Sequence, residues 1–169
     1  MHRRLGILVL GILLPACSNV DNHHPELRAM LDEAPFTLRE SVPVALGATP
    51  GNAERAALFT ADPIFSVKIL ASSARTDVRV SPSTGEVVSS QAAGAGAFNC
   101  PDAIPLVDAL AIAEDTAKGE AIQSVPDDDV TCAFEIQVLS GEFLIEVKVS
   151  PDGKVLEQEP SDEFTGKED

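Results

Sequence analysis

The chain of 169 residues contains no tryptophan and no tyrosine, and its large aromatic side chains are seven phenylalanines. These absences largely exclude the aromatic platforms on which nucleobases and sugar rings stack. Histidine occurs only at His2, His23 and His24, all near the N-terminus. The rest of the chain therefore lacks the base needed for Ser-His or Cys-His catalysis. Its core must be built from valine, isoleucine, leucine, alanine and phenylalanine, and we expect a protein without catalytic residues.

Basic residues are also scarce: 12 lysines and arginines face 27 aspartates and glutamates, a net charge of −15. Such a surface repels nucleic acid and anionic membranes, and it attracts basic partners or cations. We therefore expect no nucleic-acid partner. Gly94 and Gly96 lie outside the strand, lysine and helix context of a phosphate-binding loop. No cofactor is expected.

A short apolar run near the N-terminus ends at a cysteine. The basic start MHRR is followed by Leu5 to Leu14, which carry no charge. This run is shorter than the about 20 apolar residues of a membrane-spanning helix, and it is typical of a secretory signal peptide. The ending LPAC, with Cys17, resembles the lipobox of bacterial lipoproteins. That resemblance implies removal of residues 1–16 and attachment of fatty chains, palmitate among them, to Cys17.

The lipobox resemblance also has consequences for location. Acylated Cys17 would anchor the mature chain in a lipid bilayer. Ser18, rather than aspartate, follows the cysteine, and the lipoprotein sorting rule then places the protein in the outer membrane, facing the periplasm. Pro15 departs from the small or β-branched residue usual at its position. The alternative is an ordinary signal peptide cut after Ala16, which leaves a free thiol.

The remaining cysteines are Cys100 and Cys132. An exported chain meets an oxidising compartment, so a disulfide between them is expected. The chain-entropy model assigns such a loop about 3–4 kcal/mol of stabilisation. The alternative is a pair of separate buried thiols.

Two parts of the sequence resemble each other in order and spacing. The segment FSVKIL, Phe65 to Leu70, matches FEIQVL, Phe134 to Leu139. The segment VRVSPSTGEVV, Val78 to Val88, matches IEVKVSPDGKVL, Ile145 to Leu156. Because several separate segments agree in the same order, we interpret them as two tandem repeats.

Each repeat opens on a helix. Leu106, Ala109, Leu110 and Ala113 form an apolar stripe at helical spacing. In the first repeat, Thr37 and Glu40 have the spacing of a capping box.

Alternating apolar and polar residues then predict strands. Cys132 would face inward with Phe134, and Ser140-Gly141 reads as a hairpin turn. Weaker edge strands are expected at Ala53–Phe59 and Glu120–Val125. The predicted fold is α+β: two tandem repeats, each one helix packed on a small antiparallel sheet of about four strands.

This plan resembles the PepSY domain. The resemblance rests on LVDALAIAEDTAKGEA and FEIQVLSGEFLIEVKVSPDGKVLEQE in the second repeat, and on FTLRESVPVAL, FSVKIL and VRVSPSTGEVV in the first. The family often has aspartate where Ser81 and Ser150 stand, and tyrosine where Phe65 and Phe134 stand. It implies a fold similar to the tandem-repeat inhibitor of β-lactamase, and binding or restraint of peptidases, with no catalytic residue to carry over.

The sequence is divided into six parts. We expect a signal peptide at 1–16, a lipid-anchored tether in which a short helix could form at 17–35, PepSY-like repeats at 36–90 and 104–160, a Gly/Ala linker at 91–103 and an acidic tail at 161–169.

Two polar clusters could in principle bind metal. His23 and His24 are adjacent, so their side chains point apart, and we interpret them as a solvated pair. Asp127 to Asp129 lack the spacing of a calcium loop and are expected in a solvated turn. No metal site is predicted.

A partner surface is expected on the open sheet face. Ile64, Leu70, Leu139 and Leu144 fall on the outward side of the predicted strands. Exposed together, they would form an apolar site for a protein partner. The alternative is that the two repeats use them to pack against each other.

These observations favour a non-catalytic periplasmic lipoprotein that binds another protein through its PepSY-like sheets. Restraint of a peptidase or other envelope enzyme is the specific form of this hypothesis. The alternative is a structural or quality-control envelope lipoprotein without an enzyme target. A hydrolase is a third hypothesis, which the histidine content opposes.

Overall fold

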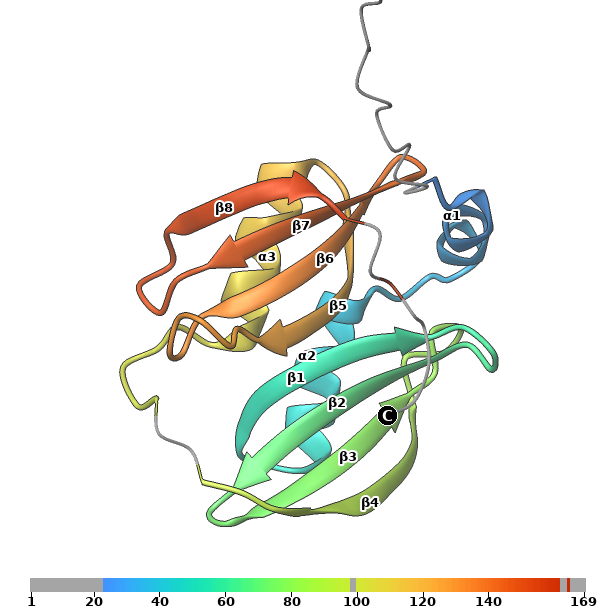
Figure 1. The fold of residues 1–169 in the computed structure, drawn as a ribbon. Helices are drawn as coiled ribbons and strands as arrows, with labels where there is room; N and C mark the ends of the chain where they lie inside the picture. The colour runs from blue at the N-terminus through green and yellow to red at the C-terminus, as the bar shows by residue number, and fades with distance from the viewer. Residues whose placement is uncertain (1–22, 98–99, 162–163, 165–169) are drawn as a thin grey trace, which may run out of the picture.

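The computed structural model describes residues 23–97, 100–161 and 164 (Figure 1). Three helices occur in this part of the chain: α1 (Pro25–Asp32), α2 (Leu38–Ala48) and α3 (Leu106–Ala117). Four strands follow α2: β1 (Asn52–Phe59), β2 (Ile64–Ala71), β3 (Ala74–Val80) and β4 (Val87–Ala95). Four more follow α3: β5 (Glu120–Pro126), β6 (Phe134–Ser140), β7 (Phe143–Val149) and β8 (Val155–Pro160).

All eight strands belong to a single antiparallel sheet, in the order β4-β3-β2-β1-β5-β6-β7-β8. The prediction of two repeats, each with its own four-stranded sheet, is therefore wrong. The sheet is continuous because β1 pairs with β5, through Ala56 opposite Ser124 and Ala57 opposite Gln123. Both strands were expected to be edges. Pairing two edges satisfies backbone groups that would otherwise stay unpaired, and it removes a liability of small sheets.

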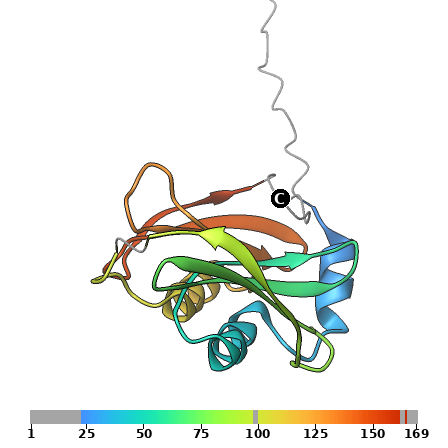
Figure 2. The same cartoon turned by 90° about the horizontal axis from the view of Figure 1, so that it is seen from below.

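Helices α2 and α3 lie side by side on one face of this sheet, and the other face is open to view in Figure 1 (Figures 1 and 2). Arg39 of α2 and Glu114 of α3 form an ion pair of 2.8 Å between the two helices. Desolvation raises the pKa of Glu114, against the lowering effects of a backbone hydrogen bond from Ala121 and the charge of Arg39. The apolar residues beneath both helices form one cluster.

The start of α2 follows from its sequence. Thr37 is the N-cap: its side chain accepts a hydrogen bond from the Glu40 backbone N–H at 3.2 Å, and the Glu40 carboxylate accepts from the Thr37 N–H at 2.9 Å. This confirms the predicted capping box, which satisfies backbone donors that a helix start leaves free. Leu38, Val42 and Ala45 then face the core and are buried.

Helix α3 begins after Pro105 and ends at Ala117, and its C-cap residue Lys118 has a left-handed φ of 57°. The predicted stripe of Leu106, Ala109, Leu110 and Ala113 is buried as expected. Beneath it, Phe134, Ile136 and Val138 of β6 pair with Val149, Val147 and Ile145 of β7.

Helix α1 stands at one end of the sheet and runs from the open face toward the layer of α2 and α3 (Figure 2). Its Leu27 and Leu31 are buried in the main apolar cluster. Arg28 of α1 donates to Glu120 at the start of β5 at 2.9 Å and pairs with Asp32 one turn on. The segment expected as a tether therefore contributes a helix to the core.

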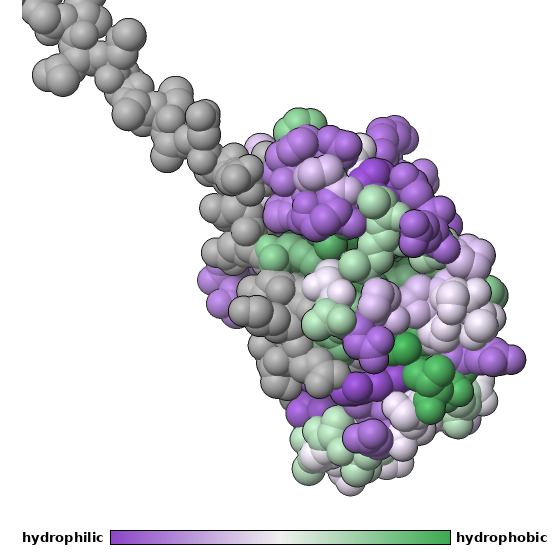
Figure 3. Space-filling view, turned by 90° about the vertical axis from the view of Figure 1, so that its right-hand side faces the viewer, coloured by the Kyte–Doolittle hydropathy of each residue, from purple (hydrophilic) through white to green (hydrophobic). Residues whose placement is uncertain are grey.

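The surface on the α1 side carries hydrophobic residues as separate small patches among hydrophilic ones (Figure 3).

Strand β4, the last strand of the first half of the chain, continues to Ala95. It therefore includes residues 91–95 of the segment expected as a linker. Nowhere in the described ranges is a helix both long and apolar enough to span a membrane.

Candidate functional site

A cleft of about 580 Å³ lies where the two halves of the chain meet. This volume is in the range of ligand-binding pockets, which are usually lined by apolar groups with a few placed polar ones. Its walls come from α2, the start of β1, the start of α3, the end of β5 and the loop before β6. The lining side chains include the apolar residues Val42, Leu46, Ala103 and Ile104 and the charged residues Glu54 and Arg75.

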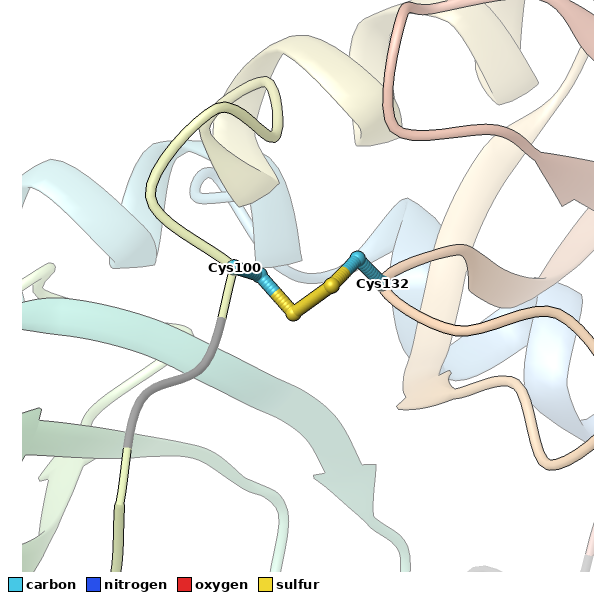
Figure 4. The surroundings of a disulfide bond; sticks show 2 residues. All are labelled: Cys100 and Cys132. Atoms are coloured by element: carbon cyan, nitrogen blue, oxygen red, sulfur yellow. A yellow bond between two sulfur atoms is a disulfide. The ribbon is translucent and has the colours of Figure 1, made fainter.

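The disulfide between Cys100 and Cys132 forms part of the cleft wall. Figure 4 shows that it joins the loop that leads into α3 to the loop before β6. The two Cα atoms are 5.6 Å apart, within the usual range for a disulfide. The predicted pairing is confirmed. The predicted position of Cys132 on the inward face of a strand is wrong, because its φ of 67° is left-handed and β6 begins at Phe134.

The loop before β6 is held in place by a buried carboxylate. Asp127 accepts backbone hydrogen bonds from Asp129 and Val130, and its Oδ2 lies 2.8 Å from Lys148 Nζ on β7. Its side chain is fully buried. Desolvation acts to raise the pKa of Asp127, but Lys148 and the backbone donors together lower it. The expectation of a wholly solvated turn at Asp127 to Asp129 is thus wrong for Asp127.

The charged side chains of the cleft lining, Glu54 and Arg75, form an ion pair. Arg75 Nε donates to Glu54 Oε2 at 2.7 Å, and Arg75 Nη1 donates to the Ala95 carbonyl oxygen at 3.0 Å. The hydrogen bond to Glu54 raises the pKa of Arg75. The guanidinium also packs over Gly96, where a Cβ would come within 2.6 Å of Arg75 Cζ. The two opposite charges compensate each other, and most of the remaining lining residues are apolar.

The cleft lining is mainly apolar, with a few polar groups. Its described lining offers one carboxylate, one guanidinium, the Asn52 amide, the Thr131 hydroxyl and a disulfide. Glu54 is the one carboxylate in the described lining, and it is paired with Arg75 at 2.7 Å. In the part of the chain that the structure describes, no group of three or more histidine, cysteine, aspartate or glutamate side chains could hold a metal ion. The arrangement suits apolar groups inserted between the two halves.

A second polar feature lies on the sheet face away from α3. Glu135 of β6 and Glu146 of β7 share a hydrogen bond, and Gln137 Nε2 donates to Glu146 Oε2 at 2.8 Å. Burial first, and then the negative charges of Glu135 and Glu159, raise the pKa of Glu146 to about 7, against the lowering effect of the hydrogen bond from Gln137. Burial also raises the pKa of Glu135. Two carboxyl groups so placed favour sharing a proton.

The residues predicted for an exposed partner surface lie elsewhere. Leu70, Leu139 and Leu144 are at most 1% exposed, and Ile64 is half-buried. Leu139 and Leu144 face each other across β6 and β7 and join the cluster that includes Leu27 of α1. These three leucines therefore cannot form an exposed apolar patch. The period-two pattern placed them on the correct side of the strands, but it gave no sign of the segments that cover that side.

Both histidines make contacts with neighbouring side chains; the His23 side chain is 48% exposed, as expected of a solvated residue, whereas that of His24 is only 19% exposed. His23 Nε2 lies 2.6 Å from Glu142 Oε2, and its ring packs against Phe143 at 5.2 Å. His24 Nδ1 lies 3.1 Å from Glu26 Oε1. The segment before α1 is thereby attached to the β6–β7 hairpin. Cys17, the predicted lipidation site, lies outside the described residues, and its acylation stays a prediction.

Comparison with known proteins gives little further guidance. No family model matches the chain, and no curated protein matches it. One solved structure is similar, a protein of Clostridium difficile 630 provisionally described as a lipoprotein. It is 15% identical, with a TM-score of 0.42, and the match covers 68% of this chain and 86% of that one. A TM-score of this size carries no argument about fold or function.

Proposed function

We propose that this protein is an envelope lipoprotein, anchored through Cys17, that binds another protein without catalysing a reaction. Support for the anchor comes from the charged start, the apolar run and the LPAC ending of the sequence. The disulfide between Cys100 and Cys132 is consistent with an oxidising compartment. Outer-membrane attachment facing the periplasm, and restraint of a peptidase or other envelope enzyme, are the specific forms of the proposal.

The cleft between the two halves is the observation that carries the binding function. Its interior is apolar, its one ion pair is internally neutral, and its volume of about 580 Å³ accommodates large side chains. Close-packed proteins rarely leave such space without a use. Leu70, Leu139 and Leu144 are already buried, so the cleft replaces the open sheet face as the site where a partner inserts apolar side chains.

A cleft-filling substitution tests this function. Ala103 lines the cleft and is half-buried, and Ala103→Phe would occupy part of its volume. Ala61, in the exposed turn between β1 and β2, offers the matched control Ala61→Phe. Each full-length variant would be expressed in its native envelope, crosslinked and purified, and circular dichroism would confirm that it is folded.

We expect the wild type and Ala61→Phe to capture the same stoichiometric protein, and Ala103→Phe to lose it. If the captured protein is a peptidase, adding the wild type should slow its turnover. An unchanged catch with Ala103→Phe would refute the cleft as the site. Recovery of envelope complexes by all three proteins, with peptidase activity unaffected, would support a structural lipoprotein instead.

A further inference from the structure

The two outer strands of the sheet differ in how well they are protected against pairing with another strand. Strand β4 carries no charged residue and no proline from Val87 to Ala95, whereas β8 carries Glu157, Glu159 and Pro160. Charged side chains on an outer strand oppose further pairing, and proline lacks the backbone N–H that such pairing uses. The β8 edge therefore has two protective features that the β4 edge lacks.

The β4 edge is also accessible. In the strand order β4 has β3 as its only neighbour, and it forms the lower border of the described molecule in Figure 1. All residues of β4 except Ser89 are exposed, and Val88 is 58% exposed. The register with β3 is regular from Ser89 to Ala92, with irregularities on either side. An outer strand of this kind presents backbone N–H and C=O groups to any strand that can lie beside it.

The distribution of charge indicates which partner suits this edge. Between Leu38 and Ala95, five basic residues balance five acidic ones. Between Leu106 and Pro160, three basic residues accompany thirteen acidic ones, a net charge of −10. These segments form opposite halves of one sheet. Two copies that meet through β4 bring their neutral halves together and keep their acidic halves at the far ends, whereas contact through β8 would bring like charges together.

We propose that two copies of this chain pair through β4 in an antiparallel arrangement, which doubles the eight-stranded sheet. Because the strand pairs with its own copy, the contact is isologous and closes with a two-fold axis. Its centre is the regular stretch from Ser89 to Ala92. The serine, glutamine and alanine side chains of this stretch carry no charge, so each can lie beside its own copy without repulsion.

Such a pair is compatible with the anchor proposed at Cys17. Directly opposed residues of an antiparallel pair point to the same face of the sheet. The helices α2 and α3 of both copies would therefore lie on one side of the joined sheet, and both open faces on the other. Helix α1 begins on the open-face side (Figure 2), so the N-terminal segments of both copies would leave the dimer toward one bilayer. The lining residues of the apolar cleft include none from β4, so the two sites are separate.

The test places the same substitution on each edge of the sheet. Gln91 on β4 and Gln158 on β8 are both exposed. Gln91→Lys puts two like charges close together across the proposed contact, whereas Gln158→Lys alters only the other edge. Sedimentation equilibrium in density-matched detergent would measure self-association of the full-length wild type and both variants. Circular dichroism would verify that each variant is folded.

We expect the wild type and Gln158→Lys to form dimers with a Kd of about 10 μM, as suits a small interface. Gln91→Lys should weaken the dimer about tenfold or more, because like charges then face each other. Gln91→Glu should weaken it for the same reason. An equimolar mixture of Gln91→Lys and Gln91→Glu should restore a dimer, a result that damage to the fold would not produce.

Several results would overturn the proposal. A wild type that stays monomeric up to about 100 μM, ten times the expected Kd, would do so. An unchanged dimer in Gln91→Lys would show that the copies meet elsewhere. Dissociation by Gln158→Lys alone would assign the contact to β8. Growth of the wild type into assemblies larger than a dimer would show a head-to-tail contact that does not close.

Discussion

Lys148 Nζ lies 2.8 Å from Asp127 Oδ2, and this ion pair attaches the loop before β6 to β7. The Asp127 side chain is fully buried, whereas the neighbouring residues Asp128 and Asp129 are exposed. The pair therefore contributes to the position of Cys132, which follows in the same loop and forms part of the cleft wall. One carboxylate of a three-aspartate run acts differently from the other two.

Replacing Asp127 should destabilise the protein, whereas replacing Asp128 should not. Asp127→Ala leaves Lys148 without its partner and the loop N–H groups without an acceptor, at a cost of about 2–4 kcal/mol. Asp128→Ala should stay within about 0.5 kcal/mol of the wild type. Urea denaturation at pH 7 measures both. Equal stability of the two variants would contradict the role assigned to the ion pair.

The lowered pKa of Asp127 gives the same pair a pH dependence. A carboxylate whose folded pKa is depressed contributes stability above its unfolded pKa of about 4, and that contribution is lost as the pH falls through the folded value. The difference in unfolding free energy between wild type and Asp127→Ala should therefore shrink below pH 4. A difference that stays constant down to pH 2 would argue against an ionised Asp127.

The disulfide between Cys100 and Cys132 should stabilise the folded chain substantially. The two cysteines are 32 residues apart, for which the chain-entropy model gives about 3–4 kcal/mol. Cys100→Ser with Cys132→Ser should lower the free energy of unfolding by about this amount and loosen the cleft wall. Thermal denaturation with and without reductant checks the prediction. In the double variant, added reductant should have no further effect on Tm.

Local sequence patterns predicted local structure well. The capping box of Thr37 and Glu40, the apolar stripe of α3 and the Ser140-Gly141 turn all occur where expected. Each depends on residues a few positions apart, so periodicity and turn chemistry were sufficient. The disulfide was also predictable, because Cys100 and Cys132 are the two cysteines that remain once Cys17 is assigned to the predicted lipidation site.

Contacts between distant segments could not be read from those patterns. Two β1 residues pair with β5, through Ala56 and Ala57, and no periodicity indicates which edge strand meets which. The burial of Leu139 and Leu144 likewise involves an apolar cluster shared with α1. Gln137 Oε1 is buried without a hydrogen-bond partner; its surroundings depend on neighbours across the sheet, and a single strand carries no signal of them.

Gly119 should not tolerate a side chain, whereas Gly47 should. A Cβ on Gly119 would overlap the backbone carbonyl of Leu139, because Gly119 directly precedes β5, whose first residue Glu120 pairs with Leu139 of β6. Nothing lies within 4 Å of a Cβ on Gly47, inside α2. Gly119→Ala should therefore cost about 2 kcal/mol or more, and Gly47→Ala should stabilise by about 0.5–1 kcal/mol. Opposite signs in urea denaturation are the expected result.

The carboxyl pair of Glu135 and Glu146 should make the protein less stable as the pH rises toward neutrality. The pKa of Glu146 is raised to about 7 from an ordinary value of 4.5, first by burial and then by Glu135, with Glu159 adding to it. Between pH 4.5 and 7, the folded state therefore holds a proton that the unfolded chain has already released. Stability attributable to this group is present below pH 4.5 and is lost as the pH rises through about 7.

Glu146→Gln removes this titration, since an amide stays neutral at every pH. The variant should be more stable than the wild type at pH 8 by about 1–2 kcal/mol, after allowance for solvent screening of a partly exposed group. At pH 4.5 the two proteins should be nearly equal. Asp115→Asn on α3 serves as the control and should show no such pH-dependent gain. Parallel wild-type and Glu146→Gln stability curves from pH 4.5 to 8 would show that the two glutamates do not share a proton, and that the face opposite α3 is an ordinary solvated surface.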